Sequence, residues 1–356
     1  MTVVRKKTGN FLEDFRVGQV FRHKGGKTVT DGLFNAFTEF NMTTNPLHKN
    51  REAARLYGYA DMICPPGLVM NVVFSQTVED ISENARANLE YINMRFGAPV
   101  YPGDTLESET TILGVAPSSK DPDRGVVHVA TVGRKQTGDV VIAFERKVQV
   151  WKSDLSAKVD AAELGNRPEV TCTPWLPSYD AARDYKSKAH LSNRDTYFED
   201  FRAGDVYEHS RGRMMTDEHI ALTAQLDNTS QVHCNQHMID QNPDKYIGGR
   251  LIIYGGIPFN LCLGISCPDI ADKALADILY TTGRHVGPLF AGDTVFAATE
   301  IRATREHPDR EDLGVLAVTL RGHKFRRPKE GEQGPQKVDI FVLEREIAVK
   351  RRSHYA

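Results

Sequence analysis

The strongest constraint on the fold is an internal repeat. "FLEDFRVGQVF" at 11–21 nearly matches "YFEDFRAGDVY" at 197–207, which begins 186 positions later. The match continues far downstream, where "RFGAPVYPGDT" at 95–105 is echoed by "RHVGPLFAGDT" at 284–294. Two copies that keep register over this length indicate duplication of a whole domain.

We therefore expect two tandem domains of one fold. Their predicted bounds are residues 11–152 and 197–350. The segment between them, 153–196, is punctuated by proline and matches neither copy. It is interpreted as a linker that wraps one half to reach the other.

Each copy contains one strongly apolar helix that opens at a glycine. The two sequences are "PPGLVMNVVFSQTVEDI" and "GGIPFNLCLGI", with Asn71 aligned against Asn260. A helix that is apolar on nearly every face is enclosed by other elements. Segments of period-two alternation follow it, such as "DTLESETTILGV" and "DTVFAATEIRAT", and these are typical of strands. An antiparallel sheet wrapped around a buried helix is the hotdog layout, so we predict an α+β double hotdog.

Composition excludes several classes of partner. A formal net charge of −2 provides no general attraction for nucleic acid or for an acidic membrane surface. No run approaches the roughly 20 apolar residues of a membrane helix, and no apolar signal core follows the basic N-terminus. The five cysteines form no CxxC pair. Reduced thiols and a cytoplasmic location are expected.

Three marks together resemble a known enzyme family. They are "NPLH" at 45–48, the glycine-led helix, and "PVYPGDT" at 99–105. In this combination the sequence resembles the MaoC-type (R)-specific enoyl-CoA hydratases, and the resemblance covers both copies. Within that family it is most similar to the mesaconyl-CoA hydratases, also called β-methylmalyl-CoA dehydratases.

The resemblance implies syn hydration of an enoyl-CoA, here reversible hydration of mesaconyl-CoA to β-methylmalyl-CoA. It implies no separate cofactor, because CoA is part of the substrate. In the family an aspartate and a histidine hold the water, and a backbone N–H at the start of the central helix binds the thioester oxygen. Gly67 and Gly256 occupy that position. A fused pair already supplies two hotdogs, so a monomer and a homo-oligomer both remain open.

The first half keeps the family motif but lacks its acid. Asn45 and His48 match the motif, whereas Thr43 stands where the aspartate is expected. Threonine is a poor proton acceptor at neutral pH. The first half therefore has the better motif and the weaker chemistry.

The second half has the better chemical case. His233 matches the motif, Asn228 holds the aspartate position, and Asp227 lies one residue earlier. Asp227 and His233 could meet if the loop is reshaped by one residue. We favour the second half as the catalytic site, and the first half remains the alternative.

A mesaconyl substrate carries a free carboxylate, so a cation is expected at the acyl end. The candidates are Arg95, Arg284 and Arg250. The equivalent placement of Arg95 and Arg284 in the two copies also fits a structural ion pair.

Two other functions and one other kind of site are weighed against hydration. Loss of the aspartate in both halves would leave a non-catalytic acyl-CoA or acyl-carrier binding protein. A thioesterase is disfavoured, because neither apolar helix has a carboxylate in its first nine residues. The pair His233 and His237 in "HCNQH" lacks further ligands at a suggestive spacing, so no metal is expected.

Overall fold

The computed structural model describes residues 8–328 and 333–356, and its strands form one twelve-stranded sheet. All pairings are antiparallel, and the main order is β1-β4-β5-β6-β3-β9-β12-β11-β10-β8. The strands of the first half and the linker are β1 (Val20–Arg22), β2 (Lys27–Thr28), β3 (Ala85–Phe96), β4 (Thr105–Pro117), β5 (Arg124–Lys135), β6 (Val140–Trp151) and β7 (Ala162–Glu163). Those of the second half are β8 (Val206–Met214), β9 (Ala274–His285), β10 (Thr294–His307), β11 (Arg310–Arg326) and β12 (Gln336–Lys350).

The helices are short, and the two longest in the described chain, α3 and α6, are the predicted apolar ones. Their bounds are α1 (Asp31–Phe40), α2 (Arg51–Leu56), α3 (Pro66–Gln76), α4 (Glu218–Gln225), α5 (Gln236–Asp240), α6 (Gly256–Ser266) and α7 (Arg352–Tyr355). At the start of α1 the Thr30 side chain caps the helix and accepts a hydrogen bond from the Leu33 N–H at 3.2 Å. In α4 the N-cap is Asp217, and its side chain forms no capping bond.

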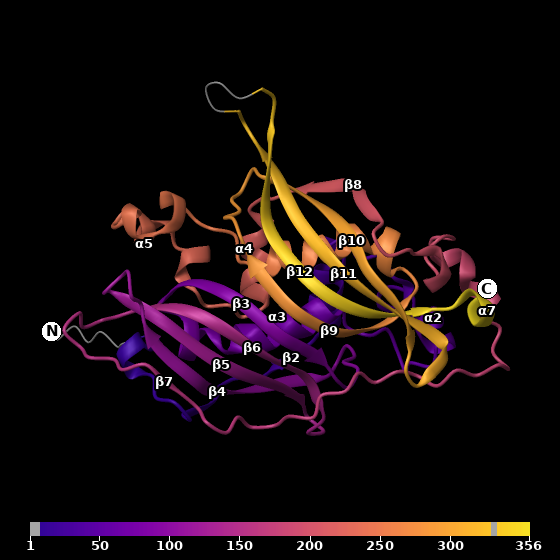
Figure 1. Cartoon of the computed structure of the whole chain (residues 1–356), viewed down its shortest axis with the longest axis horizontal. Coiled ribbons are helices and arrows are strands. Elements are labelled where there is room, and N and C mark those ends of the chain that lie inside the picture. Colours follow the sequence, from indigo (N-terminus) through magenta and orange to yellow (C-terminus); the bar gives the residue numbers. More distant parts are fainter. Residues whose placement is uncertain (1–7, 329–332) are drawn as a thin grey trace.

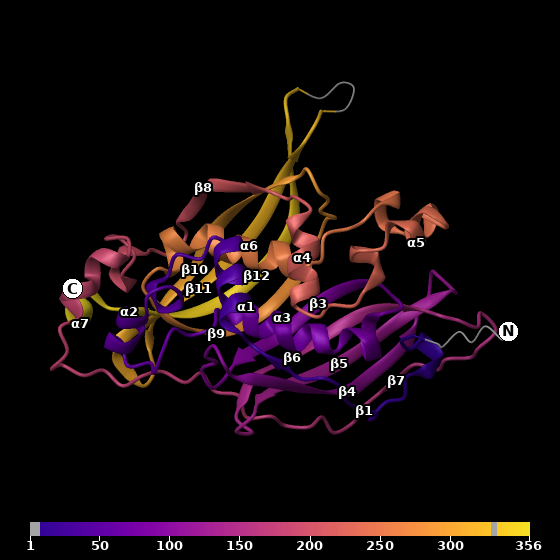
Figure 2. The ribbon, with the colours of Figure 1, turned by 180° about the vertical axis from the view of Figure 1, so that it is seen from behind.

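The two halves are joined through β3 and β9, which pair from Tyr91 opposite Gly283 to Arg95 opposite Leu279. Figure 1 shows the strands of the first half on one side of this junction and those of the second half on the other. From behind, α3 and α6 lie against the concave side of the sheet (Figure 2). Both helices are buried along almost their whole length and belong to one hydrophobic core. The predicted double hotdog is confirmed.

The two central helices approach closely at their first turns because each has a glycine there. A Cβ on Gly67 would overlap the Asn260 side chain, and one on Gly256 would overlap the Asn71 side chain. Asn71 donates a hydrogen bond to the Gly67 carbonyl at 2.8 Å, and Asn260 donates one to the Gly256 carbonyl at 2.7 Å. The aligned asparagines therefore fix a reciprocal helix contact. Gly67 and Gly256 serve this packing, and neither lines a cavity.

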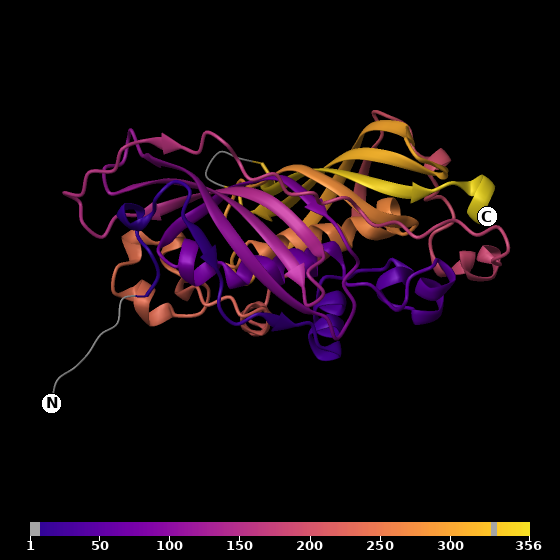
Figure 3. The same cartoon turned by 90° about the horizontal axis from the view of Figure 1, so that it is seen from below.

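The segment 153–196 crosses the outside of the first half before it reaches the second (Figure 3). Its strand β7 pairs with β4, and the Trp175 N–H donates to the Gly97 carbonyl at 3.2 Å. The strands on either side end at Trp151 and begin at Val206, and the exact domain bounds stay a prediction. All five cysteines are free. Within residues 8–328 and 333–356, no helix has the length and apolar character needed to span a bilayer.

Candidate active site

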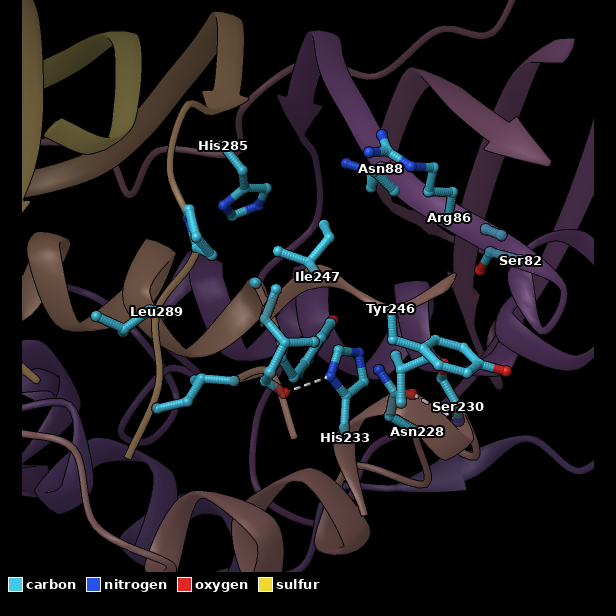
Figure 4. Close-up of a pocket in the computed structure, with 18 of the residues that line it drawn as sticks. Ser82, Arg86, Asn88, Asn228, Ser230, His233, Tyr246, Ile247, His285 and Leu289 are labelled. Atoms are coloured by element: carbon cyan, nitrogen blue, oxygen red, sulfur yellow. Dashed lines mark hydrogen bonds between the residues drawn. The ribbon is translucent and has the colours of Figure 1, made fainter. Parts of the chain in front are cut away.

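The main functional candidate is a cavity of about 350 Å³ between the halves. Its walls come from the loop and helix start that contain His233 and Gly255, from the strand end at His285, and from β3 of the first half. Figure 4 shows the side chains of His233 and His285 reaching the same cavity from different segments. Neither half builds this site alone, because the helix start belongs to one copy and the β3 wall to the other.

His233 has a defined tautomer in this cavity. Its Nδ1 lies 2.9 Å from the Ile252 carbonyl oxygen, so Nδ1 carries the proton and Nε2 keeps a lone pair. Burial lowers the pKa of His233 to about 4, against the raising effect of the bond to Ile252. The ring is therefore neutral at pH 7. His233 can accept a proton at Nε2.

His285 is a second histidine in the cavity, and sequence reasoning missed it. It ends β9, and its Nε2 would lie 2.7 Å from a Cβ on Gly255, so the ring covers the start of α6. Its Nε2 also lies 3.4 Å from the Tyr91 hydroxyl, and burial lowers its pKa to about 4. The signal was present in the repeat, since "RHVGPL" has histidine where "RFGAPV" has Phe96.

Asn228 and Asp227 point in different directions. Asn228 lines the cavity and accepts a hydrogen bond from the Ser230 N–H at 3.1 Å, which leaves its amide nitrogen as a donor. Asp227 has a left-handed φ of 59° and forms an ion pair with Lys27 at 2.7 Å, with its side chain 58% exposed. The predicted meeting of Asp227 and His233 is wrong, because the left-handed turn directs the carboxylate away from the cavity.

The start of α6 presents a backbone donor to the cavity. Gly255 is the N-cap residue and lines the wall, so its N–H has no acceptor within the helix. The Ile257 N–H already donates to the Tyr254 carbonyl at 2.9 Å, and Pro258 has no N–H. The glycine in contact with the cavity is thus Gly255, one residue before the predicted Gly256. In the first half the equivalent wall residue is Pro66, which has no N–H.

The first half has only a small pocket, of about 70 Å³, at the equivalent place. His48 repeats the geometry of His233, with Nδ1 2.8 Å from the Ile63 carbonyl oxygen. Asn45 is structural, because its amide donates to the Ala271 and Ala274 carbonyls, each at 2.9 Å.

The linker narrows this first pocket. Pro174 and Trp175 form part of its lining, and the Trp175 ring packs on Tyr59 with 5.4 Å between centroids. Phe96 also lines it, at the position that His285 holds in the second half. The first pocket therefore lacks the space, the second histidine and the backbone donor of the larger cavity.

Only one of the three predicted arginines reaches a cavity. Arg250 lines the large one, together with Arg86 and Lys245, and all three are exposed at its rim. Arg95 and Arg284 are exposed, line neither cavity, and form no ion pair with another described residue. The structure therefore supports neither a contact with the substrate carboxylate nor a structural ion pair for Arg95 and Arg284. Across the described chain no three His, Cys, Asp or Glu side chains cluster as metal ligands would.

Comparison with known proteins shows the family of this chain. The family model described as mesaconyl-CoA hydratase matches residues 2–330. The chain belongs to the mesaconyl-CoA hydratase family. A β-methylmalyl-CoA dehydratase of Chloroflexus aurantiacus is 34% identical over 342 residues, covering 94% of this chain and 95% of the relative. A mesaconyl-CoA hydratase of Cereibacter sphaeroides is 32% identical, covering 89% and 90%.

Solved structures of similar proteins have the same double hotdog fold. A putative MaoC domain dehydratase from Chloroflexus aurantiacus superposes with a TM-score of 0.87 at 31% identity, covering 98% of this chain and all of that one. A conserved hypothetical protein of Mycobacterium tuberculosis with a double hotdog fold has a TM-score of 0.75 at 20% identity, with 95% and 98% covered. The second likeness supports the fold alone. For this member of the mesaconyl-CoA hydratase family, the large cavity is the place to look for the chemistry.

Proposed function

We propose that the protein is a hydro-lyase that interconverts mesaconyl-CoA and β-methylmalyl-CoA in the cavity that contains His233. The observation that carries this proposal is a neutral histidine with a free Nε2 in the same cavity as a helix start with a free N–H group. The identity of the substrate is proposed from the family to which the chain belongs. No separate cofactor is needed, because addition of water changes no oxidation state overall.

The proposed forward reaction adds the elements of water across the conjugated double bond. His233 Nε2 accepts a proton from water while the water oxygen bonds to the β-carbon. The double-bond electrons move toward the thioester, and the α-carbon then takes a proton back from the imidazolium. Asn228 donates a hydrogen bond that orients the water. One base on one face gives syn addition.

Charge that develops on the thioester oxygen needs donors that are already in place. The N–H group of Gly255, which lines the cavity, lies at the positive end of the α6 dipole. Fixed donors of this kind stabilise an enolate more than they stabilise the uncharged ester. The exposed cations Arg86, Lys245 and Arg250 at the rim suit the CoA phosphates.

The test is a panel of thioesters. Purified protein with mesaconyl-CoA should remove the absorbance of the conjugated thioester, and the product should contain one added water by mass. Crotonyl-CoA tests whether an ester without the distal carboxylate is accepted. Binding without any absorbance change would support an acyl-CoA or acyl-carrier binding protein, and release of free thiol would indicate a thioesterase.

The pH dependence of kcat/KM should reflect the depressed histidine pKa. A base with a pKa of about 4 stays neutral far below the ordinary histidine value of about 6.5. We expect kcat/KM to be level from about pH 8 to pH 6 and to fall only as the pH approaches the lowered value. Initial rates measured across buffers of constant ionic strength check this. An acid limb centred near pH 6.5 would show that His233 is not held in the neutral form by burial.

A further inference from the structure

A buried arginine without a carboxylate partner lies directly behind the wall of the active cavity. Arg146 on β6 is 0% exposed, and its Nη2 donates to the Thr77 hydroxyl at 2.7 Å. Its Nε and Nη1 have no hydrogen-bond partner, and no described carboxylate forms an ion pair with it. Burying an unpaired charge is costly, so such a group calls for a functional explanation.

The guanidinium is close to side chains that line the cavity. It lies 4.3 Å from the centre of the Phe74 ring, and the Tyr91 and Tyr254 hydroxyls are near enough to interact with its charge. Tyr254 in turn packs against His233, with 5.5 Å between ring centroids. The positive charge is therefore one side chain away from the proposed base.

The second half contains an equivalent buried arginine, Arg345, which has a carboxylate partner within the protein. Arg345 on β12 lies opposite Tyr280 of β9 in the strand register, just as Arg146 on β6 lies opposite Tyr91 of β3. Arg345 has a carboxylate partner, Asp277, at 3.4 Å.

The position of Asp277 is taken by Asn88 in the first repeat. Asn88 lines the large cavity, and neither polar atom of its buried amide has a partner. The second half therefore has a carboxylate beside its buried arginine. The other contains a cation, an unsatisfied amide and a cavity.

We propose that Arg146, with Asn88, is the specificity determinant that receives the distal carboxylate of the substrate, the carboxylate taking the place that Asp277 fills in the other half. This rests on the proposed function for the identity of the ester. In mesaconyl-CoA the β-carbon that gains the hydroxyl also bears the carboxylate, so its counter-charge must lie close to His233. The Asn88 amide and the tyrosine hydroxyls contact the carboxylate, and Arg146 supplies the positive charge behind them.

The test compares two esters that differ at one group. Mesaconyl-CoA has a carboxylate where 2-methylcrotonyl-CoA has a methyl group. Asn88→Asp rebuilds the internal ion pair and should lower the ratio of kcat/KM for mesaconyl-CoA over 2-methylcrotonyl-CoA by about 100-fold, the scale of losing a buried charge partner. Arg146→Met should lower the same ratio by a similar factor. Asn93→Asp adds the same charge to an exposed position of β3 and should leave the ratio unchanged.

Binding measurements test the carboxylate preference independently of the proposed hydration reaction. Calorimetry with methylsuccinyl-CoA and 2-methylbutanoyl-CoA, the saturated counterparts, measures carboxylate preference without turnover. A wild-type preference that Asn88→Asp abolishes supports the inference even if no ester is hydrated, in which case only the hydratase proposal fails. An unchanged preference in Asn88→Asp, whose folding is checked by thermal unfolding, overturns the inference.

Discussion

His233→Ala is expected to lower kcat/KM for mesaconyl-CoA by about 100-fold or more, the scale of losing a general acid–base group. The variant removes the Nε2 lone pair that accepts the water proton, while the N–H groups at the start of α6 stay in place. Binding of the thioester should change much less than turnover. Initial rates over a range of substrate concentrations separate the two effects.

His48→Ala is the matched control within the same chain. His48 has the same tautomer, fixed by the Ile63 carbonyl, but it lies in the small pocket lined by Trp175. Its replacement should alter kcat/KM by no more than about two-fold, because no thioester reaches it. If His48→Ala abolishes turnover and His233→Ala does not, the assignment of the active half is reversed.

Gly67→Ala is expected to destabilise the fold by about 3 kcal/mol or more, as overpacking in a close contact does. The added Cβ would overlap the Asn260 side chain, which is 3% exposed and held by its bond to the Gly256 carbonyl. Because α3 and α6 share one core, the two halves would have to separate to relieve the overlap. The midpoint of thermal unfolding measures the effect.

Gly165→Ala provides the control for that substitution. Gly165 lies in the linker, its φ is not left-handed, and nothing lies within 4 Å of an added Cβ. Its unfolding midpoint should match that of the wild type. A Gly67→Ala protein as stable as the wild type would mean that the helices can shift apart without penalty, and the reciprocal contact would not be a structural requirement.

The sequence predicted the parts of the fold that a repeat and a hydrophobic pattern encode. Duplication, the two enclosed helices and the equivalence of His48 with His233 follow from residues that align in register. The sequence analysis also favoured the second copy as the active half. Its reason was Asp227, whose side chain in fact forms an ion pair with Lys27. A left-handed φ at one loop residue decides that direction, and no spacing rule reveals it.

The roles that the sequence analysis missed depend on contacts between separate segments of the chain. Gly67 meets Asn260 only where α3 crosses α6. Arg146 lies on the same face of β6 as the buried Phe144 and Val148, so the alternation indicates that it is buried. The alternation does not show that Nε and Nη1 of Arg146 have no partner, whereas Arg345 has Asp277. Such contacts depend on tertiary packing, which the local pattern does not specify.

A structure of His233→Ala with mesaconyl-CoA bound would test the assignment of the site most directly. The account predicts the thioester oxygen at the N–H group that opens α6, the β-carbon beside the space vacated by the imidazole, and no ligand in the pocket of His48. Density for the acyl group in that smaller pocket, or a thioester remote from Gly255, would contradict it.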